Sequence, residues 1–469
     1  MHISSLPGKY SSGSFGENAK EFIDFLSECG FSYWQVLPFC PVDEYNSPYK
    51  SHSTFAGNPY FIDLEVLFKK GLVTLDELKS AEQKTPYVCE FDRLSKERYD
   101  LLLKASKRVA DKDVIEKYIK ERPYLSSFCE FMALKTANNF CEWQKWEKKD
   151  IDNDILFMWK FIQYEFFTEW KEIKSYANSK GVGIIGDIPF YVSEDSADVW
   201  ANPQLFELDE DFNPKRVAGV PPDYFSADGQ LWGNPLYNWE KMKADGYKWW
   251  LDRVRFMLEI FDGLRIDHFR AFESYWAVPA TEKTAKNGEW IKGPQMDLLS
   301  KIREVAGDKL IIAEDLGLIT KEVEDLVAES TFPGMRVFQF GFFGGESTHM
   351  PHNYIKNCVA YTGTHDNNTL LGYLWELDDN TRKNMLSYCG YENPDWERGL
   401  FSMIRAIWSS NADIAILTIQ DMLGYGSDTR LNMPGRAEGN WCYRVTKEQL
   451  DSIDKLKFKR LNEIYYRRG

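Results

Sequence analysis

The sequence predicts an α/β fold, a (β/α)8 TIM barrel with large insertions after strands 2 and 3. Two observations predict it. Short apolar or β-branched runs recur along the chain, each ending in a polar cluster, and helical patterns lie between most of them. Strands that alternate with helices form parallel sheets. An open doubly wound sheet has the same alternation, so the barrel is the favoured of two architectures.

The expected strands follow one another from the N-terminus to the C-terminus. Residues 1–3 look like the end of a first strand. Seven further runs have the near-continuous apolar composition of buried parallel strands. They are residues 33–37, 182–188, 264–267, 310–314, 337–340, 359–362 and 414–419. Helices are expected between them at residues 17–29, 247–261, 320–329 and 394–409.

Two connections are too long for a simple strand-to-helix step. Residues 65–175 form a charged, mostly helical insertion, and residues 190–245 form a loop-rich insertion with many Pro and Asn turn signals. Within the first, amphipathic or aromatic helices are expected at 76–81, 98–109, 128–149 and 156–176. Loops that follow barrel strands build the active-site face, so both insertions are expected to wall a cleft. Residues 1–469 are interpreted as one catalytic barrel that contains both.

Charge and composition exclude several function classes. The net charge is −15, so we expect neither nucleic acid nor an anionic membrane as a partner. No apolar run approaches the roughly 18–20 residues of a membrane span, and no signal peptide is recognisable at the N-terminus. The eight cysteines have irregular spacing, which favours a reduced, cytoplasmic protein.

Motif searches give no reason to expect a cofactor or a metal. The chain has no Cys-x-x-Cys pair, phosphate loop or dinucleotide fingerprint, and Pro351 interrupts the spacing of His349 and His352. Aromatic residues make up 15% of the chain. Most are expected to pack in the core, but some are candidates for stacking on sugar rings.

Three acidic residues stand at the carboxyl ends of expected strands or just beyond them: Asp267, Glu314 and Asp366. This is the position at which barrel enzymes carry out chemistry. One such residue could simply cap the next helix, but three of them, two beside a histidine, favour a functional site.

The strand period sharpens this interpretation. Arg265 and Asp267 are two residues apart, so their side chains project to the same face, where the guanidinium would keep the carboxylate ionised. Retaining glycosidases need an ionised nucleophile and a protonated carboxylic acid, the role expected for Glu314. Asp366 would help to stabilise the transition state. The alternative is a buried ion pair that only braces the barrel wall.

Several strings resemble the 4-α-glucanotransferase family, also called amylomaltases or disproportionating enzymes, glycoside hydrolase family 77 of the α-amylase clan. In addition to the strings around Asp267, Glu314 and Asp366, they are HISSLPG at 2–8, SPYKS at 47–51, FAGNP at 55–59, GDIP at 186–189, EDSA at 194–197, GVPPDYF at 219–225, GQLWGNP at 229–235, NMPG at 432–435 and GNW at 439–441. They extend from residue 1 to about residue 444 in the family's order.

The resemblance implies an enzyme that acts on α-1,4-glucans, and the absence of cofactor motifs predicts that its chemistry needs no cofactor. Asp267 would form a covalent glucosyl intermediate, Glu314 would be the general acid and base, and Asp366 would stabilise the transition state. The glucanosyl unit would pass to the 4-hydroxyl of another glucan or of glucose, so maltodextrins would be disproportionated.

The resemblance also implies a set of substrate-binding residues. Arg265 would orient Asp267, His268 and His365 would contact the sugars around the scissile bond, and Tyr49 would lie under the cleaved sugar. The remaining candidates are Ser47, Asp187, Asp223, Tyr224, Phe225, Trp232, Asn234 and Asn440. Of these, Asp223, Trp232 and Asn234 would hold the acceptor, while loop packing explains Tyr224 and Phe225 about equally well.

Two other functions remain open from the residues. Water could capture the same intermediate, which would make the protein an α-amylase-like hydrolase. A non-catalytic glucan-binding protein would need the aromatic residues but not the three carboxylates.

Overall fold

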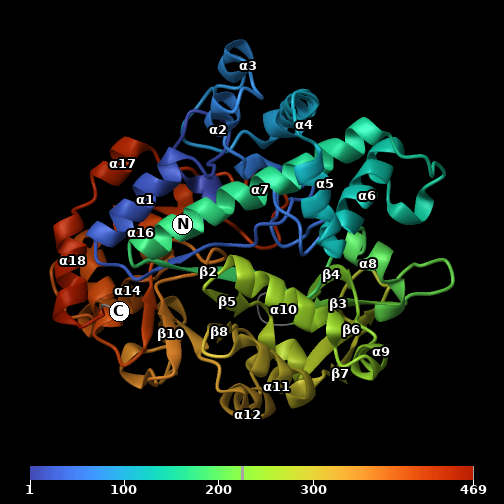
Figure 1. The fold of residues 1–469 in the computed structure, drawn as a ribbon. Coiled ribbons are helices and arrows are strands. Elements are labelled where there is room, and N and C mark those ends of the chain that lie inside the picture. The colour runs from blue at the N-terminus through green and yellow to red at the C-terminus, as the bar shows by residue number, and fades with distance from the viewer. Residues whose placement is uncertain (223–225, 468–469) are drawn as a thin grey trace.

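A computed structural model covers the chain and describes residues 1–222 and 226–467. At its centre is a parallel sheet (Figure 1). In spatial order its strands are β1 (Tyr33–Gln35), β2 (Gly183–Ile188), β5 (Gly263–Ile266), β8 (Leu310–Ala313), β9 (Gly334–Val337), β10 (Cys358–Tyr361) and β11 (Ile414–Ile416). Each strand pairs with the next such strand along the chain, which is the order of a β/α barrel.

The predicted barrel fold is confirmed, with two local corrections. The predicted bounds 337–340 of one strand are wrong. The strand β9 is Gly334–Val337, and the residues that follow, Phe338–Phe342, form a 3₁₀ helix. The predicted first strand is not found within the described residues. Met1 and His2 lie beside β1 but contact it through side chains, and Ile3–Ser5 forms a 3₁₀ helix.

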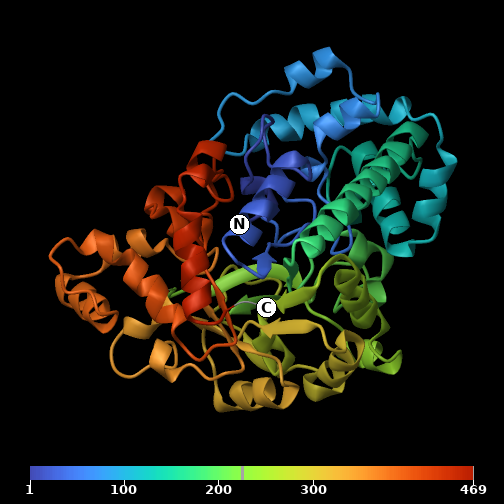
Figure 2. The ribbon, with the colours of Figure 1, turned by 60° about the vertical axis from the view of Figure 1, so that its left-hand side comes forward.

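Helices surround the sheet. Neighbouring pairs link α15 to α18, α18 to α1, α1 to α7, α7 to α10, α10 to α11, and α11 to α12. Their bounds are α1 (Glu17–Glu28), α7 (Asn153–Ser179), α10 (Lys248–Ile260), α11 (Gln295–Ala306), α12 (Lys321–Ser330), α15 (Leu400–Trp408) and α18 (Lys455–Ile464). Figure 2 shows the blue N-terminal segment beside the red C-terminal helices, so the two ends of the chain meet.

The long connection between β1 and β2 is helical, and its helices α4, α5 and α6 pack on α7. The bounds are α2 (Leu64–Lys69), α3 (Leu75–Ser80), α4 (Phe91–Lys107), α5 (Asp113–Lys120) and α6 (Pro123–Ala137). The predicted helix 128–149 is wrong beyond Ala137. Asn139 and Phe140 have left-handed backbone conformations, with φ of 53° and 60°, which stop a helix.

A second sheet, which the sequence did not predict, flanks the barrel. Its antiparallel order is β4-β3-β6-β7. The bounds are β3 (Arg216–Val220), β4 (Gln230–Pro235), β6 (Ser274–Pro279) and β7 (Glu289–Lys292). Two of these strands come from the loop-rich insertion after β2, and two follow β5. The pairing of β3 with β6 is therefore a long-range contact that local patterns do not reveal.

The aromatic residues of α7 belong to the core, as expected for packing side chains. Trp159, Phe161, Phe166 and Trp170 are all almost completely buried. Trp170 packs edge-to-face against Phe39, with ring centroids 4.6 Å apart. α7 is thereby fixed to the outer face of the barrel wall.

Short helices complete the described part of the chain. They are α8 (Ala197–Ala201), α9 (Trp239–Ala244), α13 (Leu370–Glu376), α14 (Asp379–Tyr388), α16 (Ile419–Leu423) and α17 (Lys447–Asp451). Among the residues described, no helix has the length and apolar character that crossing a membrane requires.

Candidate active site

Predicted site residues meet at the carboxyl end of the parallel sheet. Asp187 lies in β2 and is in register with Arg265 of β5, and Ile266 is in register with Ala313 of β8. Asp267 and Glu314 therefore follow directly at the ends of two paired strands. Parallel pairing brings together residues that are far apart in the sequence.

Arg265 connects two carboxylates. Its Nη1 donates to both oxygens of Asp187, at 2.9 and 2.8 Å, and its Nη2 lies 2.8 Å from Oδ1 of Asp267. The side chains of Arg265 and Asp187 are buried. Burial opposes the charge on Arg265, but the two carboxylates raise the pKa of its guanidinium well above its usual value. Asp267 is thus ion-paired with a permanent cation.

Tyr49 joins this network from the loop after β1. Its hydroxyl donates to Oδ2 of Asp187 at 2.7 Å and lies 3.3 Å from Nδ1 of His365. Its ring stacks on the His365 ring, with centroids 4.8 Å apart. Asp187, a predicted substrate-binding residue, is therefore covered by Tyr49 and Arg265 and does not line the cleft described below.

Glu314 has the environment of a protonated carboxylic acid. Burial and the nearby charge of Asp267 raise the pKa of Glu314 to about 8, although Arg265 and the backbone hydrogen bond from His268 oppose this. Oε2 accepts from the backbone N–H of His268 at 2.6 Å, and Oε1 accepts from that of Leu316 at 3.0 Å. A carboxyl group with this pKa holds its proton at neutral pH and can donate it.

His268 is held in an unusual conformation between Asp267 and Glu314. Its φ of 49° is left-handed, which is uncommon for a residue other than glycine and is typical of functional sites. Burial lowers the pKa of His268 to about 4, so its ring is neutral near pH 7. The Trp232 ring packs edge-on against it, with centroids 4.8 Å apart.

Asp366 is held ionised on the opposite side of the site. Burial would raise its pKa, but the charge and hydrogen bond of His365, with a hydrogen bond from Asn432, lower the pKa of Asp366 to about 2. Nδ2 of Asn432 donates to Oδ1 of Asp366 at 2.5 Å. The Arg430 side chain donates a hydrogen bond to the backbone oxygen of Asp366. Arg430 and Asn432 therefore both link the segment after α16 to Asp366.

An open cleft of about 560 Å³ is bordered by Asp267, His268, His365 and Asp366, whereas Glu314 is not among its lining residues. Its walls come from the loop after β1, the loop after β2, β4, the ends of β5 and β10, and residues 432–441. Most predicted site residues line it: Ser47, Tyr49, Trp232, Asn234, Asp267, His268, His365, Asp366 and Asn440. Asp187 and Arg265 support this wall from behind. Asp223, Tyr224 and Phe225 lie outside the described residues.

Comparison with known proteins agrees with this geometry. The family model of the 4-alpha-glucanotransferases, glycoside hydrolase family 77, matches residues 1–450. The chain belongs to the 4-alpha-glucanotransferase family. It is 43% identical to a 4-alpha-glucanotransferase from Clostridium butyricum over the full length of both chains. A relative with the same description from Streptococcus pneumoniae is also 43% identical, with 100% of this chain and 96% of that protein covered.

A solved structure confirms both family and fold. The amylomaltase from Streptococcus agalactiae in complex with acarbose superimposes with a TM-score of 0.95 at 36% identity, covering 100% of this chain and 99% of that one. The predictions of a (β/α)8 barrel, of an enzyme and of the glucanotransferase family are confirmed.

Two asparagines that were predicted to bind substrate, Asn234 and Asn440, form hydrogen bonds with the protein backbone. Nδ2 of Asn234 donates to the backbone oxygen of Val192 at 2.8 Å. Asn440 accepts from the Met433 N–H at 2.9 Å and donates to the Arg436 oxygen at 2.7 Å. Both border the cleft of this glucanotransferase-family chain, and both also fix the shape of a cleft loop.

Sequence reasoning missed Asn432 and Arg430 as site residues. Asn432 belongs to one of the sequence strings that resemble the family. A sequence string does not show which residue the Asn432 side chain contacts. Within the described residues, no group of three or more His, Cys, Asp or Glu side chains is arranged to hold a metal ion.

Proposed function

We propose that this site transfers glucanosyl units between α-1,4-glucans with retention at the anomeric carbon. The observation that carries the proposal is the contrast between two neighbouring carboxyl groups. Asp267 is paired with Arg265, whereas burial and the charge of Asp267 raise the pKa of Glu314 to about 8. Such a difference between two neighbouring carboxyl groups assigns one to nucleophilic attack and the other to proton donation.

In the first step, the Asp267 carboxylate attacks the anomeric carbon of the donor. The glycosidic C–O bond breaks, and Glu314 gives its proton to the departing oxygen. The products are a glucosyl ester of Asp267 and a shortened glucan, and Glu314 is left as a carboxylate. Arg265 stays bonded to Asp187 and Asp267 and so orients the nucleophile.

In the second step, the Glu314 carboxylate takes the proton of an acceptor 4-hydroxyl group. The acceptor oxygen attacks the anomeric carbon and displaces Asp267, which returns as a carboxylate. Asp366 is ionised and faces the same cleft, so it stabilises the positive charge that develops on the sugar in both steps.

The remaining cleft residues would bind the sugars. Two ring pairs border the cleft. The rings of Tyr49 and His365 are stacked, and the rings of Trp232 and His268 pack edge-to-face. We assign the first pair to the donor sugar and the second, with Asn234 and Asp223, to the acceptor. Tyr224, Phe225, Ser47 and Asn440 stay predicted substrate contacts.

The loop-rich insertion 190–245 would wall the cleft within one catalytic domain, and its residues 190, 191, 230–232 and 234, which border the cleft, support this. The helical insertion 65–175, which was also expected to wall the cleft, contributes none of its lining residues. The predicted cytoplasmic location, and the prediction that nucleic acid is not a partner, remain predictions.

The distribution of products from maltotriose tests the proposed transfer. Transfer produces glucose and longer maltooligosaccharides while the number of reducing ends stays constant. A steady rise in reducing ends would instead support the α-amylase-like hydrolase. The variant Asp379→Asn, which changes an exposed carboxylate on α14, is the matched control and should give the unchanged product pattern.

A further inference from the structure

The segment 362–370 connects β10 to α13 and carries two predicted site residues, His365 and Asp366. Its two ends are buried, whereas residues 364–367 are only partly buried, and His365 and Asp366 line the cleft. The part of the segment that faces the substrate is therefore the part with the least packing around it. Its position depends on how the two ends are held.

One side chain joins both ends of this segment. Oδ2 of Asp421, on α16, accepts from the hydroxyl of Thr362 at 2.6 Å, and Oδ1 accepts from the backbone N–H of Leu370 at 2.7 Å. Asp421 is 4% exposed, and Thr362 and Leu370 are fully buried. A single buried carboxylate thus links the first residue of the segment to the last.

The start of α16 holds this carboxylate in a defined place. The hydroxyl of Thr418 accepts from the N–H of Asp421 at 3.2 Å, which caps the helix. The oxygen of Ile416, at the end of β11, accepts from the N–H of Thr362 at 3.2 Å. The helix that carries Asp421 and the segment that Asp421 contacts therefore both start from the paired strands β10 and β11.

Hydrogen bonds within the segment extend from its ends to Asp366. Oδ1 of Asn367 accepts from the N–H and from the hydroxyl of Thr364, both at 2.9 Å. Oγ1 of Thr364 accepts from the N–H of Asp366 at 3.3 Å. These bonds connect the segment into one unit, so a shift at either end is passed on to Asp366.

The two bonds of Asp421 cannot be removed without a cost at both ends. Burial raises the pKa of Asp421, whereas the hydrogen bonds from Thr362 and Leu370 lower it, so both donors stabilise the ionised carboxylate. Without this carboxylate, the hydroxyl of Thr362 and the N–H of Leu370 would lose their acceptor in a buried space. The segment would have to move to find other partners.

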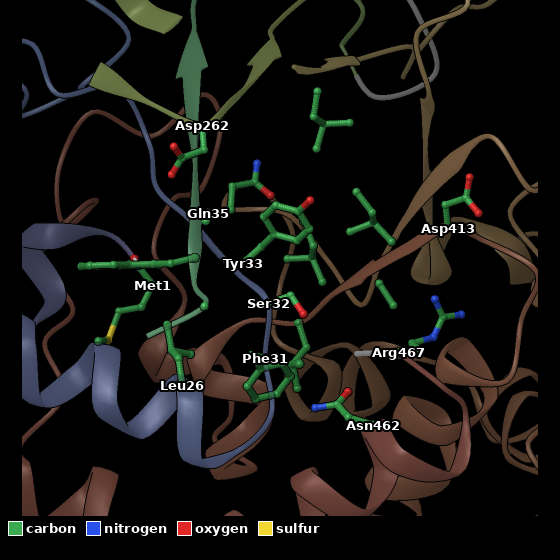
Figure 3. A pocket seen from close by; sticks show the side chains of 18 of the residues that line it. Met1, Leu26, Phe31, Ser32, Tyr33, Gln35, Asp262, Asp413, Asn462 and Arg467 are labelled. Carbon is green, nitrogen blue, oxygen red and sulfur yellow. The ribbon is translucent and has the colours of Figure 1, made fainter. Parts of the chain in front are cut away.

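A different side of α16 provides a comparison. Ile419 and Met422 line a cavity of about 1070 Å³ that also borders β1, β11 and α1. Figure 3 shows this cavity, with Asp413 and Arg467 on one side of it. Asp421 is not among its lining residues, so the carboxylate of Asp421 and the side chain of Met422 lie on different sides of α16. A change at Met422 can therefore disturb the helix without removing a hydrogen bond of Asp421.

We propose that Asp421 is a positioning residue for glucanosyl transfer, and that it acts by holding both ends of the segment that carries Asp366. This inference rests on the proposed function, in which Asp366 stabilises the positive charge that develops on the sugar. Asp421 does not line the cleft, so it acts through the segment. Electrostatic stabilisation needs a carboxylate that is in place before the charge develops, and a displacement of about 1 Å is enough to weaken it strongly.

Asp421→Ala removes both hydrogen bonds and is the main test. We expect kcat on maltotriose, per folded molecule, to fall about 10- to 100-fold while KM changes less than about threefold, because the other walls of the cleft still bind the glucan. Asp421→Asn should restore kcat to within about fivefold of the unchanged protein, because its amide can accept from Leu370 and donate to Thr362. The matched control Met422→Ala should lower the melting temperature and leave kcat per folded molecule unchanged.

Thr362→Val tests the same link if Asp421→Ala does not fold. It keeps the shape of the side chain and removes one of the two bonds, so we expect kcat to fall about 3- to 10-fold. Unchanged kcat in the variants of Asp421 and Thr362, or an equal loss of kcat in Met422→Ala, would overturn the positioning role.

A double variant separates this inference from the proposed function. Asp366→Asn alone should lower kcat at least about 100-fold, and unchanged kcat in that variant would contradict the proposed function itself. If Asp421 acts through Asp366, adding Asp421→Ala to Asp366→Asn should lower the remaining kcat by less than about threefold. A further loss as large as the loss in Asp421→Ala alone would overturn this inference and leave the proposed function standing.

Discussion

Two clusters of buried acidic residues in this protein have similar electrostatics and different surroundings. In the candidate active site, burial and Asp267 raise the pKa of Glu314 to about 8. Where α2 meets α7, burial and nearby acidic residues raise the pKa of Glu169 well above its usual value, and its Oε2 accepts from the N–H of Asp63. A perturbed pKa is therefore common to both clusters and does not by itself identify an active site.

The difference lies in access and in position relative to the barrel strands. Glu169 is on a helix, is 3% exposed, and helps to hold Asp63, the N-cap of α2. Glu314 directly follows barrel strand β8. It lies beside Asp267, which is paired with Arg265 and lines an open cleft. Position at the strand ends, together with an accessible partner, distinguishes a reactive carboxyl group from a structural one.

Asp267→Asn should have the largest effect because it removes the proposed nucleophile. We expect kcat on maltotriose to fall at least about 10⁴-fold, while maltooligosaccharide binding measured by calorimetry persists. Unchanged turnover would remove Asp267 from its role as the nucleophile.

Glu314→Gln keeps the shape of the side chain and removes its transferable proton. We expect kcat to fall about 10²- to 10⁴-fold. Glu169→Gln is the matched control and should leave kcat per folded molecule unchanged. A similar loss of kcat in both variants would mean that replacing any buried glutamic acid lowers kcat, and that the position of Glu314 at the site is not the cause.

Asn432→Ala should have an intermediate effect. It removes the hydrogen bond to Asp366, and a hydrogen bond to a charged group contributes about 1.5–3 kcal/mol. If that bond positions Asp366 for the transition state, kcat should fall about 10- to 100-fold with little change in KM. An increase in KM alone would assign Asn432 to binding of substrate.

The pH dependence of kcat/KM should reflect the proton on Glu314. Above pH 8, we expect kcat/KM to fall about tenfold per pH unit as this proton is lost. Because the folded pKa lies above the unfolded one, its contribution to stability is complete below about pH 4.5 and is lost as the pH rises through about 8. Denaturant unfolding of Glu314→Gln should lack this component, and an identical pH dependence in both proteins would refute the shift.

Glu169→Gln should have the smallest effect on stability. Burial raises the pKa of Glu169 well above its usual value and so favours the neutral acid, which the neutral amide resembles, and the amide oxygen can still accept from Asp63. We expect the free energy of unfolding to change by about 1 kcal/mol or less, whereas Glu169→Ala should cost about 1–3 kcal/mol by leaving that N–H unpaired. Equal losses in the two variants would show that the hydrogen bond does not matter.

The features predicted correctly depend on residues close together in the sequence. The prediction that Arg265 and Asp267 share one face came from a two-residue spacing, and the 2.8 Å ion pair confirms it. The helices predicted at 17–29 and 247–261 correspond to α1 and α10, because their apolar periodicity is local. By contrast, β3 and β6 pair across 50 residues or more, and no local pattern marked either strand.

The sequence by itself determined the alternation of strands and helices, the positions of the three carboxylates at or near strand ends, and the family. Those properties follow from short-range periodicity and from recognisable strings. Only the tertiary structure decided the pKa of Glu314, the bridge from Asp187 through Arg265 to Asp267, and the hydrogen bond from Asn432 to Asp366. Burial and Coulomb energies depend on which distant segments lie within a few ångströms of each other, and that distance is set by the packed fold.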